Sequence, residues 1–387
     1  MFDFFTFQVR PRIIFKAGAI DGLRAEIEQL RASRTVIITD QGTRDAGLIE
    51  RVQAGMAGAT TLAGVFSNVP QGASIAATEQ AAAFAHSVEA NLLIAVGGGS
   101  SLDTAKAMRI LLAEGGTLRA HADNIRLNQP LIPLIAIPTT AGSGSEVSTW
   151  ASVRDATART KISLNHPALA PDLALLDPEL TYTMPPQLTA ATGLEALAHA
   201  IEALAGINAN PISDILALQA IDMISNNLRD ATYDGGDMAA RGAMLIAACI
   251  AGMAFSSSGG SGLGMIHALA LAIGGTLDVQ HSLVNTVLLP YGMQFNSVAV
   301  PNRFARIARY MGVNSGGRPE EDVIADGIDA VRLLAADCGL PSRLRDVGVP
   351  QAAIPSIVDT ALTDPAWLNN PRTVTPEQLL EILYTAW

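Results

Sequence analysis

The sequence contains few charged residues, few aromatic residues and almost no cysteine. Charged residues make up only 16% of its 387 positions, and the formal net charge is -11. This acidic balance argues against nucleic acid or an anionic membrane as a partner, because both are bound through basic surfaces. Hydrophobic residues make up 49% of the chain, so disorder is not expected. A chain of this length predicts two domains rather than one core.

The two cysteines and the longest apolar run also restrict where the protein is expected to work. Cys249 and Cys338 form no CxxC motif and are expected to be small core residues in a reducing compartment, with a structural disulfide as the alternative. The longest apolar run, residues 242–255, is too short to cross a bilayer and predicts a buried helix. Asp3 interrupts the apolar start of the chain, which therefore lacks the pattern of a signal peptide. These features predict a cytoplasmic protein with no membrane partner.

Strand and helix patterns alternate through the first half of the chain. Apolar and β-branched runs predict strands, whereas Ala- and Leu-rich periodic segments predict helices. The expected strands are residues 35–40, 91–96, 130–137, 161–164 and 173–176, with an edge strand or arm within 5–15; the expected helices are 19–31, 75–90 and one that ends near 113. This alternation is typical of an α/β domain with a mostly parallel sheet.

A glycine-rich turn follows the most apolar of these strands. Residues 97–100 are three glycines and a serine, placed between the strand 91–96 and a helix. Glycines let the backbone approach a pyrophosphate, whose negative charge then lies against the free N–H groups of the helix start. The turn matches neither GxGxxG nor a P-loop, and a tight turn without a ligand remains an alternative. Its context favours phosphate binding, with Asp103 and Lys106 either contributing or forming a local pair that orders the loop.

Two more stretches of this half are candidates for nucleotide contacts. Asp40 ends the strand 35–40, where a carboxylate can accept hydrogen bonds from an adenine ribose and repel the extra phosphate of NADP. A turn-forming role fits Asp40 equally well. Residues 138–146 form a loop of small residues with several hydroxyls, which can follow a flat ligand and donate hydrogen bonds to it.

The second half reads as helical. The expected helices are residues 188–204, 213–228, 238–255, 304–311, 323–338 and 376–386. Strand patterns end near Pro185 and Pro186, so the predicted domains are residues 1–184 and 185–387.

A carboxylate and three histidines form a candidate metal site in this helical half. Glu195 and His199 are four residues apart, so their side chains meet on one helix face. A solvated Glu–His pair is the alternative. His267 and His281 lie among apolar neighbours, with His281 at the end of a helix or in the turn after it. Buried imidazoles without partners are costly, and a shared cation would satisfy all of them.

Several segments together resemble the iron-containing (group III) alcohol dehydrogenases. The matching segments are residues 97–106, 138–147, 177–180, 192–202, 264–270, 288–291 with His281, and 370–372. The resemblance implies the dehydroquinate synthase-like architecture: an N-terminal α/β dinucleotide-binding domain, an all-α C-terminal domain, and an active site in the cleft between them. It also implies a homodimer or a higher homo-oligomer that acts on small alcohols and aldehydes.

The resemblance assigns roles to individual residues. The cofactor-binding positions are Asp40, Gly97, Gly98, Gly99, Ser100, Asp103, Thr139, Thr140, Ser143 and Lys161. The metal ligands are Glu195, His199, His267 and His281, of which His267 and His281 also count as catalytic. The implied cofactors are NAD, with NADP possible, and Fe(II) or Zn(II).

The sequence departs from the family pattern at two positions. Glu195 replaces the usual Asp ligand, and the extra methylene moves the carboxylate by about 1.5 Å. Leu271 replaces a histidine that many members carry one turn after the position of His267. This change implies either a more apolar substrate pocket or proton transfer through water and the cofactor ribose.

The predicted reaction is hydride transfer between an alcohol and NAD, assisted by a cation that polarises the oxygen. A metal-independent reductase of the maleylacetate type is an alternative, because such enzymes lack the acidic ligand. A dehydroquinate-synthase-like cyclase would need a basic pocket, and few cations lie near the candidate metal segment. A nucleotide-binding protein without activity is the remaining alternative.

Overall fold

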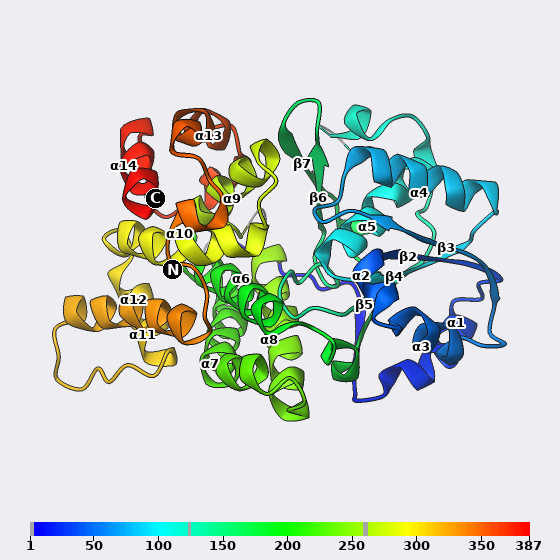
Figure 1. Cartoon of the computed structure of the whole chain (residues 1–387), viewed down its shortest axis with the longest axis horizontal. Coiled ribbons are helices and arrows are strands. Elements are labelled where there is room, and N and C mark those ends of the chain that lie inside the picture. The colour runs from blue at the N-terminus through cyan, green and yellow to red at the C-terminus, as the bar shows by residue number, and fades with distance from the viewer. Residues whose placement is uncertain (1–3, 123–124, 258–261) are drawn as a thin grey trace. The chain divides into compact units, whose positions relative to one another are not determined.

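The computed structural model describes residues 4–122, 125–257 and 262–387. Contacts divide the chain into two compact units. The sheet unit contains Val9–Thr140 and Gly144–Met184, and the helical unit contains Met1–Gln8, Ala141–Ser143 and Pro185–Trp387. Figure 1 shows strands in the first part of the chain and helices in the second. The predicted fold class, a parallel α/β part followed by an all-helical part, is confirmed for the described residues.

Packed helices form the helical unit. They are α6 (Pro186–Ala205), α7 (Pro211–Tyr233), α8 (Met238–Ser256), α9 (Met265–Thr276), α10 (His281–Ser297), α11 (Pro301–Tyr310), α12 (Glu320–Asp337), α13 (Ile354–Ala361) and α14 (Pro376–Ala386). Gly193 lets α6 approach α7 and α8 closely, because an added Cβ would lie 2.3 Å from Leu228 Cδ1 and 2.9 Å from Met244 Cε. Gly193 therefore allows α6 to pack closely against α7 and α8.

The apolar helix predicted over residues 242–255 is part of α8. By length and composition alone α8 could cross a membrane, but 67% of its most apolar 18-residue stretch is buried within the structure. It packs against α6 and α7, as the core helix of a globular unit does. Its apolar composition is therefore explained by packing among helices.

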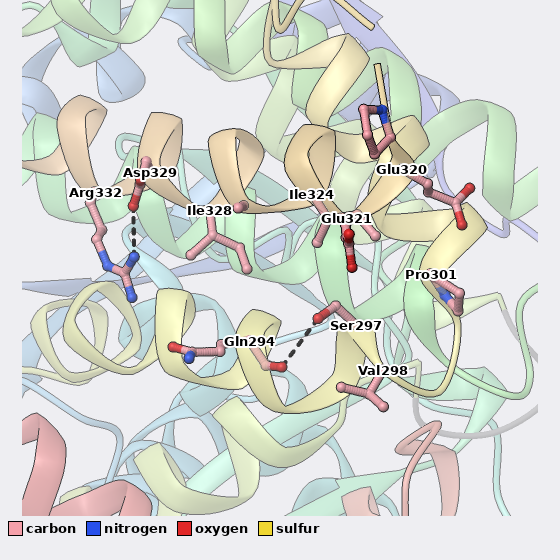
Figure 2. Close-up of a pocket in the computed structure, with 12 residues that line it drawn as sticks. Gln294, Ser297, Val298, Pro301, Glu320, Glu321, Ile324, Ile328, Asp329 and Arg332 are labelled. Atoms are coloured by element: carbon pink, nitrogen blue, oxygen red, sulfur yellow. Dashed lines mark hydrogen bonds and ion pairs between the residues drawn. The ribbon is translucent and has the colours of Figure 1, made fainter. Parts of the chain in front are cut away.

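An open groove runs between α10 and α12. Figure 2 shows Gln294, Ser297 and Val298 on one side and Ile324 and Ile328 on the other. The groove encloses about 800 Å³, and Pro301 of α11 closes one end of it. Its lining residues include none of the residues predicted to bind cofactor or metal.

A six-stranded parallel sheet organises the sheet unit. Its strands are β1 (Arg12–Phe15), β2 (Arg34–Asp40), β3 (Thr61–Val69), β4 (Leu92–Gly97), β5 (Leu134–Pro138) and β8 (Leu173–Leu176), in the order β1-β8-β5-β4-β2-β3. Every neighbouring pair is parallel. From β2 the chain moves outward to β3 and then returns to the other side of β2 for β4, β5 and β8. The strand order therefore reverses between β2 and β4, and ligands of parallel sheets bind at such reversals.

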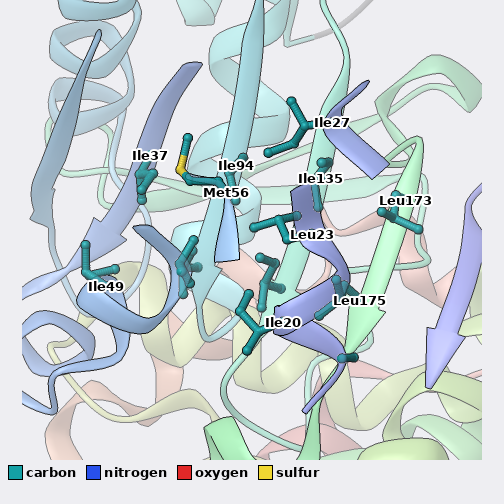
Figure 3. Packing of buried hydrophobic residues seen from close by; sticks show 14 of the residues in the cluster. Ile20, Leu23, Ile27, Ile37, Ile49, Met56, Ile94, Ile135, Leu173 and Leu175 are labelled. Atoms are coloured by element: carbon teal, nitrogen blue, oxygen red, sulfur yellow. The ribbon is translucent and has the colours of Figure 1, made fainter. Parts of the chain in front are cut away.

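Apolar side chains on both faces of the sheet hold this unit together. On β4, Ile94 and Val96 face one layer, whereas Leu93 and Ala95 face the other. The first layer contains α1 (Leu23–Gln29) and α3 (Leu48–Gly55), and Figure 3 shows Leu23, Ile27 and Ile49 packed over the strands. The second layer contains α4 (Ile75–Ser87) and α5 (Gly99–Glu114). Burial on both faces explains why these strands read as continuous apolar runs.

The remaining elements of the sheet unit are short. They include α2 (Gln41–Asp45), an antiparallel hairpin of β6 (Trp150–Asp155) and β7 (Thr160–Asn165), and short 3-10 helices. Three sequence predictions need correction. The helix expected over 19–31 is a 3-10 turn, Ala19–Gly22, followed by α1; the strand expected over 130–137 begins only at Leu134, after Pro133; and His281 begins α10 rather than ending the preceding helix.

Candidate functional site

The predicted nucleotide-binding residues of the sheet unit gather at the carboxyl ends of adjacent strands. Asp40 ends β2, Gly97 ends β4, and Pro138 ends β5. Gly97 pairs with Pro138, and the amide of Thr139 donates to the Gly97 carbonyl at 3.0 Å. These residues therefore lie at the point where the strand order reverses.

Asp40 forms the N-cap of α2. Its Oδ1 accepts from the Thr43 amide at 2.9 Å, and its Oδ2 accepts from the Thr43 hydroxyl at 2.9 Å and from Ser101 Oγ at 3.0 Å. The turn-forming role considered from the sequence is thus present. The side chain remains half-buried at the sheet edge, so capping does not remove it from the candidate nucleotide site.

Gly97 and Gly98 allow the β4–α5 turn to pass close to its neighbours. Gly97 has a φ of +146°, and an added Cβ would lie 2.6 Å from Ser101 Oγ and 2.7 Å from Asp40 Oδ2. At Gly98 an added Cβ would lie 3.3 Å from both Cγ2 and Oγ1 of Thr140. The two turns after β4 and β5 are therefore packed together, and Gly97 is required by both its backbone angle and its surroundings.

The start of α5 offers backbone donors. Its N-cap is Gly98, and no side chain caps the helix there. Gly99 and Ser100 form its first turn, and Ser100 Oγ accepts from the Gly72 amide at 2.9 Å, which ties this turn to the loop after β3. Uncapped N–H groups and the positive end of the helix dipole favour a phosphate group.

Asp103 and Lys106 hold the loop that follows β5. Asp103 Oδ1 accepts from Ser145 Oγ at 2.5 Å, and Oδ2 accepts from the Ser152 amide at 2.9 Å. Lys106 is fully buried; its Nζ donates to the Ser145 carbonyl at 2.9 Å and lies 3.5 Å from Asp103 Oδ1. Asp103 and Lys106 thus form a local pair that orders the loop, which was one of the two roles considered for them from the sequence.

Burial perturbs two charged groups around this loop. Burial lowers the pKa of Lys106, although the nearby charges of Asp103 and Glu146 oppose that change. Burial also raises the pKa of Glu146 to about 7. A buried carboxylic acid of this kind titrates within the range in which most enzymes work.

The last two predicted cofactor contacts, Ser143 and Lys161, are not among these strand-end residues. Ser143 is grouped with the helical unit together with Ala141 and Gly142. Lys161 lies on β7, where it pairs with Arg154 of β6.

The helical unit brings three predicted metal ligands together. His199 lies on α6, His267 in the first turn of α9, and His281 at the first position of α10. The rings of His199 and His267 stack with centroids 4.6 Å apart, and those of His267 and His281 are tilted with centroids 5.8 Å apart. Residues 82 positions apart in the sequence therefore form one histidine cluster.

His199 is held in its neutral form. Burial, and then the charge of His267, lower the pKa of His199 well below its ordinary value. The His199 ring also lies against Phe255, with ring centroids 4.7 Å apart. Among the described residues, Nδ1 of His199 is a buried nitrogen without a hydrogen-bond partner. A neutral imidazole with an available nitrogen is the form that binds a cation.

The orientation of His267 depends on a residue that sequence reasoning did not single out. Glu202 Oε2 lies 2.5 Å from His267 Nδ1, and both side chains are almost completely buried. On the opposite side of the ring, Asn285 Nδ2 lies 3.4 Å from His267 Nε2. Glu202 lies three residues after His199, but its partner is on another helix, so the sequence offered no signal for the pair.

The donor chemistry of the cluster suits a divalent cation. Imidazole nitrogens and a carboxylate are ligands of Fe(II) and Zn(II). Glu195 lies half-buried one turn before His199 on α6, and Leu271 occupies the position one turn after His267 on α9. In the part of the chain that the structure describes, no three His, Cys, Asp or Glu side chains are already arranged to hold an ion. The three histidine rings are therefore neighbours, and the role of all four residues as metal ligands stays a prediction.

Comparison with known proteins matches nearly the full chain. Residues 10–178 match the iron-containing alcohol dehydrogenase family, and residues 189–387 match the C-terminal part of the Fe-containing alcohol dehydrogenase family.

Individual relatives and a solved structure agree with the family match. The chain is 38% identical over 386 residues to the "probable alcohol dehydrogenase EutG" of Escherichia coli (strain K12), covering 98% of this chain and 94% of that one. It is 32% identical over 382 residues to the NAD-dependent methanol dehydrogenase of Bacillus methanolicus, covering 98% and 99%. The crystal structure of a 1,3-propanediol oxidoreductase superposes with a TM-score of 0.94 at 32% identity, covering 99% and 100% of the two chains.

Proposed function

Because the chain belongs to the iron-containing alcohol dehydrogenase family, we propose that it interconverts a small alcohol and its aldehyde or ketone with NAD(H). Family membership makes it an oxidoreductase, and the relatives include a methanol dehydrogenase and a 1,3-propanediol dehydrogenase. The observation that carries the proposal is the histidine cluster of His199, His267 and His281 in a chain with a glycine turn at the sheet reversal.

The nucleotide is proposed to bind at the carboxyl edge of the sheet. The uncapped start of α5 and the close turn at Gly97 and Gly98 would receive the diphosphate. Asp40 would accept from the adenosine ribose and repel the additional phosphate of NADP, so NAD is the proposed cofactor. The NAD dependence of the methanol dehydrogenase relative supports this choice.

The cation is proposed to be Fe(II) or Zn(II), held by Glu195, His199, His267 and His281. When bound, a divalent cation supplies Lewis-acid chemistry that makes the hydroxyl proton of an alcohol easier to remove. The chain contributes neutral imidazoles, because burial keeps His199 unprotonated at neutral pH. Leu271, where many relatives carry histidine, would give the substrate an apolar neighbour in place of a proton-transfer group.

On the basis of family membership we also propose two domains that meet between residues 184 and 185. On the same basis we propose a cytoplasmic location and a homo-oligomer. The contact units change between Met184 and Pro185, which supports the proposed domains 1–184 and 185–387.

A metal-independent reductase of the maleylacetate type is the second candidate. The observation that favours it is the absence, among the described residues, of a ready group of three metal-ligating side chains. The replacement of the usual acidic ligand by Glu195 is consistent with this reading.

The test is a panel of alcohols and aldehydes assayed with NAD(H) and NADP(H), with added Fe(II) or Zn(II) and with EDTA. We expect NAD-dependent turnover that is lost after chelation and in His267→Ala, with one divalent ion per chain by elemental analysis. His86→Ala, an exposed histidine on α4, is the matched control and should keep both metal and activity. Turnover unaffected by EDTA and by His267→Ala would favour the metal-independent reductase. NADH binding without turnover of any substrate would contradict the enzymatic proposal.

A further inference from the structure

Glu202 uses both of its carboxylate oxygens on a single helix. Its side chain is only 3% exposed and extends from α6 to the first turn of α9. Oε1 accepts from the Ile266 amide at 2.7 Å, and Oε2 contacts His267 Nδ1 at 2.5 Å. One buried acid therefore holds the backbone and the adjacent imidazole together.

The start of α9 is built to receive this acid. Its N-cap, Gly264, provides no side-chain cap, and the cap comes instead from distant residues. Asn370 Oδ1 accepts from the Met265 amide at 3.1 Å, beside the contact between Glu202 and Ile266. An added Cβ at Gly264 would lie 2.9 Å from Asn370 Oδ1 and 3.2 Å from Glu202 Oε1, so only glycine fits without displacing these groups.

The contact between Glu202 and His267 points to one tautomer of the ring. A carboxylate oxygen accepts hydrogen bonds, so its position against His267 favours a proton on Nδ1. Nε2 then keeps a lone pair, which lies 3.4 Å from the side-chain amide nitrogen of Asn285.

We propose that Glu202 is a positioning residue that fixes His267 in the Nδ1–H tautomer and so presents Nε2 as a ligand for a divalent cation. The inference rests on the proposed function, because it assigns a purpose to the ligand role of His267. Acids or carbonyls behind a ligating histidine orient its ring and raise its affinity for metal.

The variant Glu202→Gln separates this role from simple packing. The side chain keeps its shape but has one acceptor oxygen where the carboxylate has two. Either the Ile266 amide or the His267 ring then faces an NH₂ group, and the second case forces the proton of His267 onto Nε2, where it blocks metal binding. Asp214→Asn is the matched control, because it removes a buried carboxylate that pairs with Arg303 and Arg306 in the same unit.

The first measurement uses metal-free wild-type protein labelled with ¹⁵N-histidine. Long-range proton–nitrogen spectra at pH 8 should show His267, assigned through His267→Gln, protonated on Nδ1. Protonation on Nε2 would overturn the proposal, whatever the function of the protein.

The second measurement is the dissociation constant for Zn(II) of wild type, Glu202→Gln, Glu202→Asp and Asp214→Asn. We expect Glu202→Gln to bind on the order of 10–100-fold more weakly, Glu202→Asp to recover part of the loss, and Asp214→Asn to match wild type. Equal affinity in Glu202→Gln and wild type would overturn the role of Glu202. If wild type itself binds no metal, the proposed function fails at its metal site, and the tautomer measurement still decides the assignment for His267.

Discussion

The carboxylate of Asp40 lies in the space that a side chain at Gly97 would need. Its Oδ2 would be 2.7 Å from a Cβ added to Gly97, and it also accepts from Ser101 Oγ. These residues come from the ends of β2 and β4 and from the first turns of α5, so the acid and the glycine turn form one structure. Changes at either residue should therefore affect both stability and nucleotide binding.

Gly97→Ala should destabilise the sheet unit and weaken NAD binding. The φ of +146° is unfavourable for alanine, and the methyl group would press on Asp40 and Ser101. We expect a loss of at least about 2 kcal/mol in the free energy of unfolding. Denaturant unfolding and NADH fluorescence titration are the measurements. Gly22→Ala is the control, since nothing lies within 4 Å of its added Cβ and its φ is -89°. Similar values for both variants would contradict the expectation.

Asp40→Asn should shift cofactor preference towards NADP. The amide oxygen can still cap α2 through the Thr43 amide, but the negative charge is gone. We expect the ratio of kcat/KM for NADP to that for NAD to rise on the order of tenfold, the effect of about 1.4 kcal/mol. Asp40→Ala also loses the cap and should cost about 1 kcal/mol of stability. An unchanged cofactor ratio in both variants would show that Asp40 only forms the turn.

The buried acid Glu146 should make stability fall as the pH rises. Its pKa is raised from 4.5 to about 7 by burial, so between these values the folded state keeps a proton that the unfolded state releases. The stabilisation is complete below about pH 4.5 and is lost as the pH rises through about 7, with a difference of about 3 kcal/mol.

Glu146→Gln should remove this dependence. The variant should have a higher midpoint of thermal unfolding than wild type at pH 8.5 and differ little at pH 5. Glu320→Gln, at an exposed position, serves as the control and should follow wild type. If Glu146→Gln is equally destabilising at both pH values, the acid is ionised in the folded protein.

Glu195 should matter for metal affinity if it supplies the acidic ligand. Glu195→Ala should reduce the affinity for Zn(II) by at least about tenfold, since one charged ligand is lost. Glu195→Asp restores the residue usual in this family and should bind within about tenfold of wild type. Calorimetric titration of metal-free protein measures both. If Glu195→Ala binds Zn(II) as tightly as wild type, Glu195 is not the acidic ligand that accompanies the three histidines.

The sequence indicated the central strands and long helices correctly because their apolar patterns are strong. The runs that became β4 and β8 and the Ala- and Leu-rich α6 have few competing interpretations. Other elements were missed for local reasons. β3 contains Gly64 and Asn68, α2 has only five residues, and α10 contains Pro290, which is typical of a helix end.

The sequence predicted which site residues lie together only where neighbouring strands end side by side or where one helix turn joins the residues. The gathering of Asp40 and Gly97 follows from parallel strands ending at one edge. The partnership of Glu202 with His267 depends on how α9 meets α6, and 65 positions separate the two residues. Periodicity describes the faces of one helix, but not the residue that each face meets on another.

Asn296 and Asn370 exchange two amide hydrogen bonds, each 2.9 Å long, and Asn370 also caps α9. The support for His267 is therefore completed by a segment that follows it by about 100 positions in the chain. During translation, all four candidate ligands leave the ribosome before the residue that secures the helix carrying one of them. We therefore expect the histidine cluster to mature only after Asn370 has been synthesised, and a product that stops before Asn370 to contain every ligand without a finished site.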